Sequence, residues 1–325
     1  MKKLHGIAYW AAISTFGLVL PASAAPVSWN ASFVNDVGLS AADFAKFQAS
    51  INTALNFYTS TYVAPNALTV NVEFRAGSTG LGTTTITYTG VGYQEYRNAL
   101  AATGTSADDA TALGFLPNII ANPVNGNQDM LLPLPLLRAL GFAQGNNPGL
   151  DASVVLNVGS MTLDRADPQA PGTYDLIQVT YHELNEVLGW TSALNGVPNN
   201  PVISPTGVIQ AADLFRYRAS GVRSFTSDPS EAAYLSINGG VTGLANFNTD
   251  DGGDRQDFNG LPAPSVQDAF STADIRLDNG LAERTFLDVI GYNFNVAPVP
   301  EPGAITLFAV GGLVCIITRR RWTRR

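Results

Sequence analysis

The sequence predicts an α+β fold with two unlike halves: an N-terminal half of helices and twisted sheet, and an irregular, loop-rich C-terminal half. Three observations lead to this prediction. Up to Gly189, stretches with helical spacing of apolar residues alternate with short β-branched runs. Beyond Gly189, prolines at positions 198, 201 and 205 and many glycines interrupt regular patterns. Hydrophobic residues make up 46% of the 325-residue chain, which is enough for a sizeable core.

The first half is expected to open with one helix and two strands. From Ser40 to about Thr61, apolar residues recur with near-helical spacing, which predicts an amphipathic helix. Pro65 breaks that pattern. Residues 68–74 then alternate as a half-buried strand. Residues 83–89, which are rich in threonine, predict a second strand of high β-propensity.

Helices and one buried strand are expected to follow. Residues 93–102 have a helical pattern, and so do residues 131–140, although two prolines disfavour a helix there. The short apolar run 152–158 predicts a central strand. Residues 174–188 predict the helix that ends the first half, and a last helix at 281–290 closes the body of the protein.

The helix predicted at 174–188 carries the pattern HELNE, which is typical of a metal site. His182 and Glu186 are four residues apart and so share one face of the helix, and both side-chain types bind zinc. Glu183 lies about 100° round the axis, where it can deprotonate a metal-bound water. The alternative is a solvated helix face with a chance His-Glu pair. Because His182 is the only histidine outside the first 24 residues, the metal site is favoured.

Both ends of the chain have the patterns of addressing segments. Residues 1–24 combine two lysines, an apolar run and an Ala-Ser-Ala end, which predicts a signal peptide cut after Ala24. Residues 303–318 form an apolar stretch followed by five arginines in seven residues, the pattern of a membrane stop. Together with Pro300-Glu301-Pro302, this tail resembles the PEP-CTERM sorting signal of exported bacterial proteins.

That resemblance implies a Gram-negative source and export through the inner membrane, with residues 298–325 acting as the sorting signal. An exosortase-type enzyme would remove the tail after transient anchoring and release the body to the cell surface or an extracellular polymer. The alternatives are an uncleaved N-terminal anchor and a permanent tail anchor. The single cysteine, Cys315, lies in the tail, so the body has no disulfide and no thiol nucleophile.

The helix motif also resembles that of a family of PEP-CTERM-tailed proteins classed as metalloproteases. Their H-E-x-x-E-x-x-G helix corresponds to residues 182–189, and the likeness continues downstream in residues 213–217, 221–225, 243–248 and 287–292. The resemblance implies a zincin-like metallopeptidase domain over residues 25–297, with the motif helix crossing an active-site cleft. It assigns His182 and Glu186 as metal ligands and Glu183 as the general base. The order of predicted elements is also that of zincin proteases.

A third metal ligand is still required. Position 192 holds a serine where a metzincin would place a histidine, and no methionine follows the helix. We therefore expect a carboxylate, a tyrosine or an amide, and choose Asp213, with Glu231 and Asp164 as further candidates. Asp213 could instead cap a short helix or pair with Arg216. Zinc is the first choice of metal, and so acidic a ligand set also suits other divalent transition metals.

A second acidic cluster occupies residues 248–260. Its four aspartates among glycines offer oxygen ligands on a flexible loop, which suits Ca²⁺. The spacing does not fit an EF-hand, and the alternative is a solvated surface loop.

The sequence thus favours a secreted, surface- or matrix-associated peptidase that hydrolyses peptide bonds with a metal-activated water. The strand at 83–89 could pair with an extended protein or peptide substrate. The alternative is a non-catalytic matrix or adhesion protein that keeps a zincin-like fold. Seven of the 18 basic residues, but only one of the 26 acidic ones, lie in the terminal segments, so the body carries a charge of about −14. Such a body excludes nucleic acid as a partner.

Overall fold

The computed structural model describes residues 24–145, 149–194, 207–226 and 228–295, and shows a mixed α+β protein. The predicted signal peptide and sorting tail lie outside these residues, apart from Ala24. Within the described residues, no helix has the length and apolar character needed to cross a membrane.

The main sheet has four strands in the order β2 (Ser28–Asn35), β4 (Thr69–Gly77), β8 (Ala152–Asn157) and β5 (Gly82–Ile86). The first three are parallel, and β5 runs antiparallel along one edge. Because parallel neighbours need a crossover, the chain passes from β2 to β4 through helix α1 (Ala41–Thr61). The Ser40 side chain caps this helix by accepting a hydrogen bond from the backbone N–H of Asp43.

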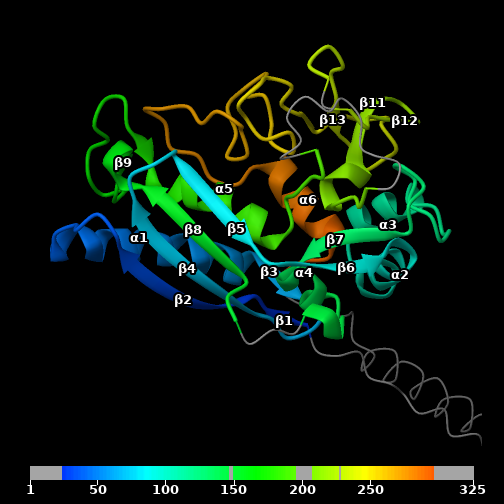
Figure 1. Ribbon diagram of the computed structural model, residues 1–325, viewed down its shortest axis with the longest axis horizontal. Coiled ribbons are helices and arrows are strands. Elements are labelled where there is room, and N and C mark those ends of the chain that lie inside the picture. Colours follow the sequence, from blue (N-terminus) through cyan, green and yellow to red (C-terminus); the bar gives the residue numbers. More distant parts are fainter. Residues whose placement is uncertain (1–23, 146–148, 195–206, 227, 296–325) are drawn as a thin grey trace, which may run out of the picture.

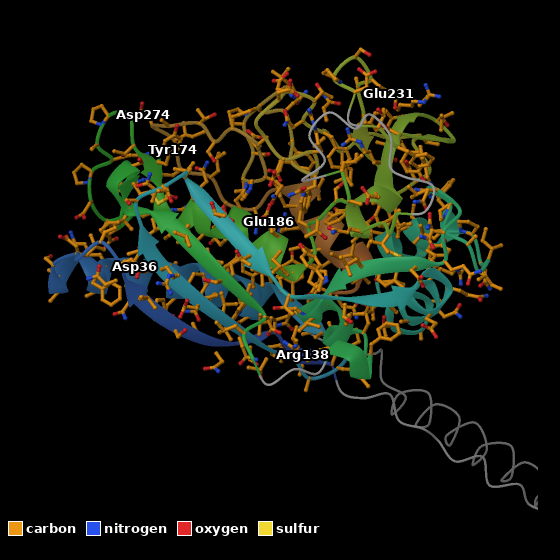
Figure 2. All side chains as sticks on the ribbon, viewed as in Figure 1. Asp36, Arg138, Tyr174, Glu186, Glu231 and Asp274 are labelled. Atoms are coloured by element: carbon orange, nitrogen blue, oxygen red, sulfur yellow. The ribbon has the colours of Figure 1, made fainter. Side chains whose placement is uncertain are left out.

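One face of the sheet packs against α1 and helix α5 (Leu176–Leu188). The strand register places Phe33, Phe74 and Val154 in one row across β2, β4 and β8, and Thr84 ends that row on β5. Side chains in one row point to the same face. The apolar row therefore ends in a hydroxyl at the edge of the sheet, directed at α5. In Figure 1, α5 lies between this sheet and the yellow and orange C-terminal segments. Figure 2 shows Glu186, which α5 carries, near the middle of the molecule.

The remaining elements are short; in Figure 1, α2, α3 and β11–β13 lie on the right, β1 and α4 at the bottom and β9 on the left. The other helices are α2 (Tyr93–Thr103), α3 (Ala107–Gly114), α4 (Leu134–Ala139) and α6 (Leu281–Ile290), with 3₁₀ turns at Ala143–Gly145, Val158–Ser160 and Ala211–Phe215. Strand β6 (Tyr88–Gly92) pairs with β7 (Asp129–Pro133), β1 (Ala25–Pro26) and β15 (Asn293–Phe294) flank β3 (Tyr62–Ala64), and β9 (Met161–Thr162) pairs with β10 (Tyr174–Asp175). The C-terminal half holds a small sheet of β11 (Arg216–Ala219), β12 (Val222–Arg223), β13 (Tyr234–Leu235) and β14 (Ala245–Asn246).

The structure confirms most of the predicted long elements and corrects two. The strand predicted at 83–89 is in fact two strands, because the chain leaves the main sheet at Thr87 and β6 pairs with β7 instead. The helix predicted at 131–140 is half strand: β7 runs to Pro133, and α4 begins at Leu134. Proline at the first turn of α4 loses no helical hydrogen bond, which explains why the helix begins there. Strand β2 was not predicted, although Trp29, Ala31 and Phe33 alternate along it.

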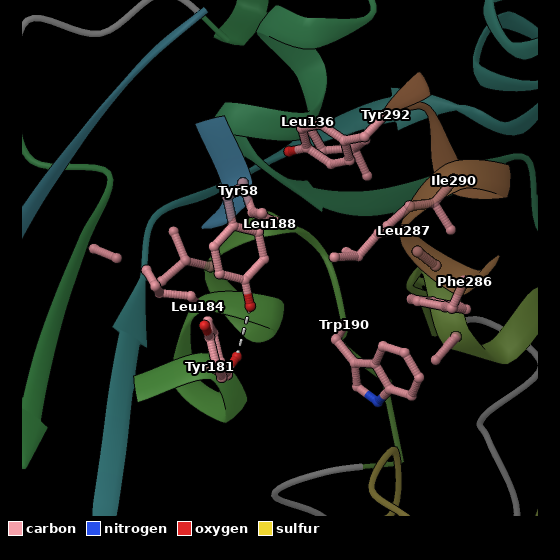
Figure 3. Close-up of a cluster of buried hydrophobic side chains, with 14 of the residues drawn as sticks. Tyr58, Leu136, Tyr181, Leu184, Leu188, Trp190, Phe286, Leu287, Ile290 and Tyr292 are labelled. Carbon is pink, nitrogen blue, oxygen red and sulfur yellow. Dashed lines mark hydrogen bonds between the residues drawn. The ribbon is translucent and has the colours of Figure 1, made fainter. Parts of the chain in front are cut away.

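The core around the end of α5 depends on a sharp turn at Gly189. This residue has φ of 128°, which side-chain-bearing residues rarely adopt, and it terminates the helix. A Cβ atom there would lie 3.0 Å from Ile290 on α6 and 3.1 Å from Leu136 on α4. The next residue, Trp190, is fully buried with its ring centroid 4.3 Å from that of Phe286, and Figure 3 shows this contact beside Leu287 and Ile290. The turn therefore allows the end of α5 to pack closely against α4 and α6.

We expect Gly189→Ala to lower the free energy of unfolding by about 1–3 kcal/mol, because both the backbone angle and the close contacts oppose a side chain. The matched control is Gly172→Ala, since Gly172 also has positive φ (76°) but has open space around it. Urea unfolding of the three proteins measures both costs. Equal losses in the two variants would show that packing at Gly189 contributes nothing beyond the backbone angle.

Candidate functional site

Helix α5 positions the three motif side chains. It begins at an N-cap, Asp175, which accepts the backbone N–H of Gln178 and pairs with Arg165 at 2.6 Å. Glu183 and Glu186 are 4% and 8% exposed, so they do not lie on a solvated helix face as the alternative interpretation supposed. The motif instead occupies the interface between the main sheet and the C-terminal half.

Three ligand-type side chains converge at this interface. The Nε2 atom of His182 lies 4.0 Å from a Glu186 oxygen and 3.5 Å from Oδ2 of Asp257, and one atom from each residue lies within 4.8 Å of the other two. Asp257 comes from the loop between β14 and α6. Nδ1 of His182 is 3.1 Å from the carbonyl oxygen of Val266. A proton on Nδ1 is donated to that carbonyl, which leaves Nε2 with a free lone pair directed at the two carboxylates.

Neutral amides hold the two carboxylates of this group. Gln267 Nε2 donates to Oδ1 of Asp257 at 2.9 Å, and Gln256 Nε2 donates to Oε1 of Glu186 at 2.8 Å. The backbone oxygen of Gln256 in turn accepts the indole N–H of Trp190. The Oε1 atom of Gln256 is buried and has no hydrogen-bond partner among the described residues. The side chain that holds Glu186 therefore has a buried oxygen without a donor, which adds to an environment that favours a cation.

Glu183 lies between this group and the edge strand β5. Thr84 Oγ1, at the end of the sheet row described above, donates to Oε2 of Glu183. Its other oxygen lies against Gly82, where a Cβ atom would overlap it. Glycine at position 82 therefore makes room for the carboxylate, and Thr84 fixes its orientation.

Burial dominates the electrostatics of the site. It raises the pKa of Glu183, and it raises the pKa of Glu186 well above its usual range with help from the neighbouring charges of Glu183 and Asp257. Burial raises the pKa of Asp257 to about 7. Burial lowers the pKa of His182, but the charges of Asp257 and Glu183 outweigh it, so that this pKa ends above its ordinary value. The donor set, one imidazole and two carboxylates with a third alongside, fits a divalent transition metal.

The structure does not bring Asp213 to this group. Its carboxylate accepts hydrogen bonds from Ser192 Oγ and from the backbone N–H groups of Ala193 and Gln210. It therefore caps the 3₁₀ turn Ala211–Phe215 and ties it to the loop after α5, which is the alternative role considered for it. Asp257 takes the third place in the group instead.

The two further candidates for the third metal ligand, Glu231 and Asp164, also lie outside this group. Glu231 pairs with Arg218 at 3.4 Å and accepts from Ser224, and Figure 2 shows it well away from Glu186. Asp164 accepts the backbone N–H of Ala166.

Asp257 belongs to the acidic stretch 248–260 that the sequence suggested for calcium. Within that stretch Asp251 is 89% exposed and pairs with Arg255, whereas Asp257 is 2% exposed. The only signal in the sequence that separates them is local: Asp257 precedes an apolar residue, Phe258, while the other aspartates adjoin glycines or one another. Among the described residues, the one group of metal-ligand type contains Asp257 and no other residue of the stretch.

The raised pKa values determine how stability depends on pH when no cation is bound. In the unfolded chain carboxyl groups titrate near pH 4, whereas in the folded chain Asp257 keeps its proton to about pH 7. The folded state therefore binds more protons in this window, and stability falls as the pH rises through it. Glu183, Glu186 and His182, whose pKa values are also raised, act in the same direction.

We therefore expect Asp257→Asn to raise the thermal midpoint in the presence of a chelator at pH 8, and to change it much less at pH 5. Added Zn²⁺ should reverse the order at pH 8 by stabilising the wild type and not the variant. Asp251→Asn, which removes an exposed charge from the same loop, is the control and should leave the midpoint nearly unchanged. A chelated Asp257→Asn protein that is less stable than wild type at pH 8 would make Asp257 a structural residue.

Comparison with known proteins adds one finding, and it concerns the C-terminal tail. A family model, the PEP-CTERM protein-sorting motif, matches residues 298–321. No protein with a curated description and no solved structure matches the chain significantly. The match confirms the sorting signal predicted at this end, which is recognised by exosortase-type machinery. The chain is thus an exported protein that is sorted to the cell surface.

Proposed function

We propose that this protein is a surface-sorted, metal-dependent peptidase with a zincin-like arrangement. The observation that carries the proposal is the convergence of His182, Glu186 and Asp257 beside a buried glutamate, Glu183. A divalent metal held there, zinc in the first instance, supplies an electrophile for the substrate carbonyl and makes water more acidic.

Glu183 is suited to the role of general base. Burial raises its pKa towards the working pH of a proton carrier, and Thr84 holds one of its oxygens. The carboxylate accepts a proton from the attacking water and returns it to the departing amine. Since Thr84 belongs to β5, the base and the edge strand are fixed relative to each other.

Strand β5 is suited to hold an extended peptide. It is the last strand of the sheet, and among the described residues no strand pairs with its outer edge. An extended substrate could add to this edge as a further strand, a recognised mode of peptide binding. This supports the expectation that the strand predicted at residues 83–89 pairs with a peptide substrate. The strand in question is Gly82–Ile86.

The alternative, a non-catalytic matrix or adhesion protein, fits the sorting motif and the acidic body equally well. A scaffold, however, gains nothing from burying Glu183, Glu186 and Asp257 together, because desolvated carboxylates reduce stability unless a cation compensates them.

Substitution of the motif residues separates the two functions. We expect the wild type to hold about one transition metal per chain and His182→Ala to lose it. Glu183→Gln should retain the metal but lose peptidase activity by about 10²–10⁴-fold, the usual contribution of a general base. Elemental analysis and cleavage of a fluorogenic peptide library measure these outcomes. A carefully loaded wild type without stoichiometric metal would contradict the peptidase function.

The charge around the site also constrains the substrate. Asp254 is exposed, its Oδ2 lies 3.4 Å from the Gln256 amide that holds Glu186, and its charge adds to the rise in the pKa of Glu186 and Asp257. A divalent cation does not balance all the carboxylates gathered there. We therefore infer a preference for peptides with a lysine or arginine near the scissile bond.

Asp254→Asn should raise KM for lysine- or arginine-containing peptides several-fold and leave KM for their glutamine counterparts almost unchanged. Asp251→Asn makes the same charge change three residues away, where Arg255 already pairs with the carboxylate, and serves as the control. Equal KM changes for both peptide types, or equal changes in both variants, would contradict this preference.

A further inference from the structure

We propose that Gln267 is the positioning residue for Asp257, and that it acts as the last member of a one-directional chain of buried hydrogen bonds that passes through Tyr58 and Asn185. The inference rests on the proposed metal site, because it concerns how one ligand of that site is oriented.

The chain crosses three parts of the fold. The hydroxyl of Tyr58 on α1 donates to Oδ1 of Asn185 at 2.7 Å and shares its proton with the carbonyl oxygen of Tyr181 at 2.9 Å. Asn185 on α5 donates through Nδ2 to Oε1 of Gln267 at 2.9 Å. Gln267 donates through Nε2 to Oδ1 of Asp257, also at 2.9 Å. Tyr58, Asn185 and Gln267 are 0% exposed, so no water replaces these bonds.

The direction of the chain is fixed by its surroundings. Asn185 Nδ2 also donates to Oδ1 of Asn279 at 3.0 Å. Reversing the Asn185 amide alone would set its oxygen against the Gln267 oxygen and its N–H₂ group against the Tyr58 hydroxyl proton. With Asn185 held in this orientation by Tyr58, Gln267 accepts from it and presents its own N–H to Asp257. Oδ1 of Asp257 therefore always faces a donor, which favours the ionised carboxylate that a metal needs.

This contact also determines which oxygen reaches the site. With Oδ1 bound to Gln267, Oδ2 is the oxygen that lies 3.5 Å from Nε2 of His182. Asp257 lies in a loop outside the regular elements, so no helix or strand geometry orients its side chain. The amide of Gln267 supplies that orientation.

The segment that contains Gln267 also orients the histidine. Val266, its neighbour, accepts from His182 Nδ1, so two consecutive residues hold two of the three converging side chains. The backbone of this segment is held on both sides. The backbone oxygen of Gln267 accepts the N–H of Phe258, and the backbone N–H of Gln267 donates to Oε1 of Glu283 on α6 at 3.3 Å. Residues 266–267 thus act as one support beneath the site.

The experiment compares two ways of damaging the same network. Gln267→Met keeps the length of the side chain but removes the donor to Asp257. Asn279→Ala removes bonds to Tyr58 and Asn185 but touches neither Gln267 nor Asp257. Zn²⁺ affinity is measured for each folded protein by competition with a chromophoric chelator, and the thermal midpoint is measured without metal.

We expect Gln267→Met to bind Zn²⁺ about 10–100-fold more weakly than wild type, the usual effect of removing a residue that orients a metal ligand. Asn279→Ala should lower the midpoint while keeping Zn²⁺ affinity within about twofold, because it does not contact the ligand. Should Gln267→Met fail to fold, Gln267→Glu, of the same shape, takes its place, and its affinity should also fall because an acceptor replaces the donor.

The outcomes separate this inference from the proposed function. If the wild type binds no Zn²⁺, the metal site itself is absent and the inference falls with it. If the wild type binds Zn²⁺ and the Gln267 variant binds it as tightly, the metal site stands and only the positioning role is overturned. Equal losses of affinity in the Gln267 and Asn279 variants would also overturn it, because they would reflect general loosening of the network.

Discussion

The burial of several carboxylates beside His182 is the constraint on which the rest of the structure depends. Glu183, Glu186 and Asp257 are each less than 9% exposed, and among the described residues no lysine or arginine pairs with any of them. The protein instead gives each one a neutral donor, from a threonine or a glutamine. Neutral donors fix direction without cancelling charge. The arrangement is therefore oriented and electrostatically unbalanced at the same time, which is the condition under which a cation binds strongly.

A different part of the fold contacts each side of α5 and holds the polar side chains there. Towards the sheet, the apolar row ends at Thr84, and Gly82 leaves space for Glu183. Towards α1, the Tyr58 hydroxyl contacts Asn185 and the carbonyl oxygen of Tyr181, and Figure 3 shows the contact with Tyr181. Towards the C-terminal half, irregular loops supply amides and Asp257. A helix enclosed on every side can present ionisable groups at fixed positions, because none of its side chains is free to rotate into solvent.

Features of the fold and of the candidate site could be predicted from the sequence where they depend on residues close together in the chain. The α5 motif was predictable because helical spacing alone places His182 and Glu186 on one face, and the turn at Gly189 marks where the helix ends. The break between β5 and β6 was not predictable, because a threonine-rich segment has the same strand propensity whichever strand it pairs with. Asp257 and Asp213 are both aspartates in loops downstream of the helix. Only tertiary contacts decide that one caps a 3₁₀ turn and the other faces His182.

The long sequence separation between the parts of the site determines when the site can assemble during folding. His182 and the carbonyl that orients it are 84 residues apart, and the partners of Asp257 come from α5 and a late loop. A chain still being synthesised, or one threaded through a membrane in unfolded form, holds the motif helix without the loop that completes it. Such a chain lacks the assembled site. The proposed metal site therefore forms only once the C-terminal half has docked, so a cation could be bound only in the compartment where folding is completed.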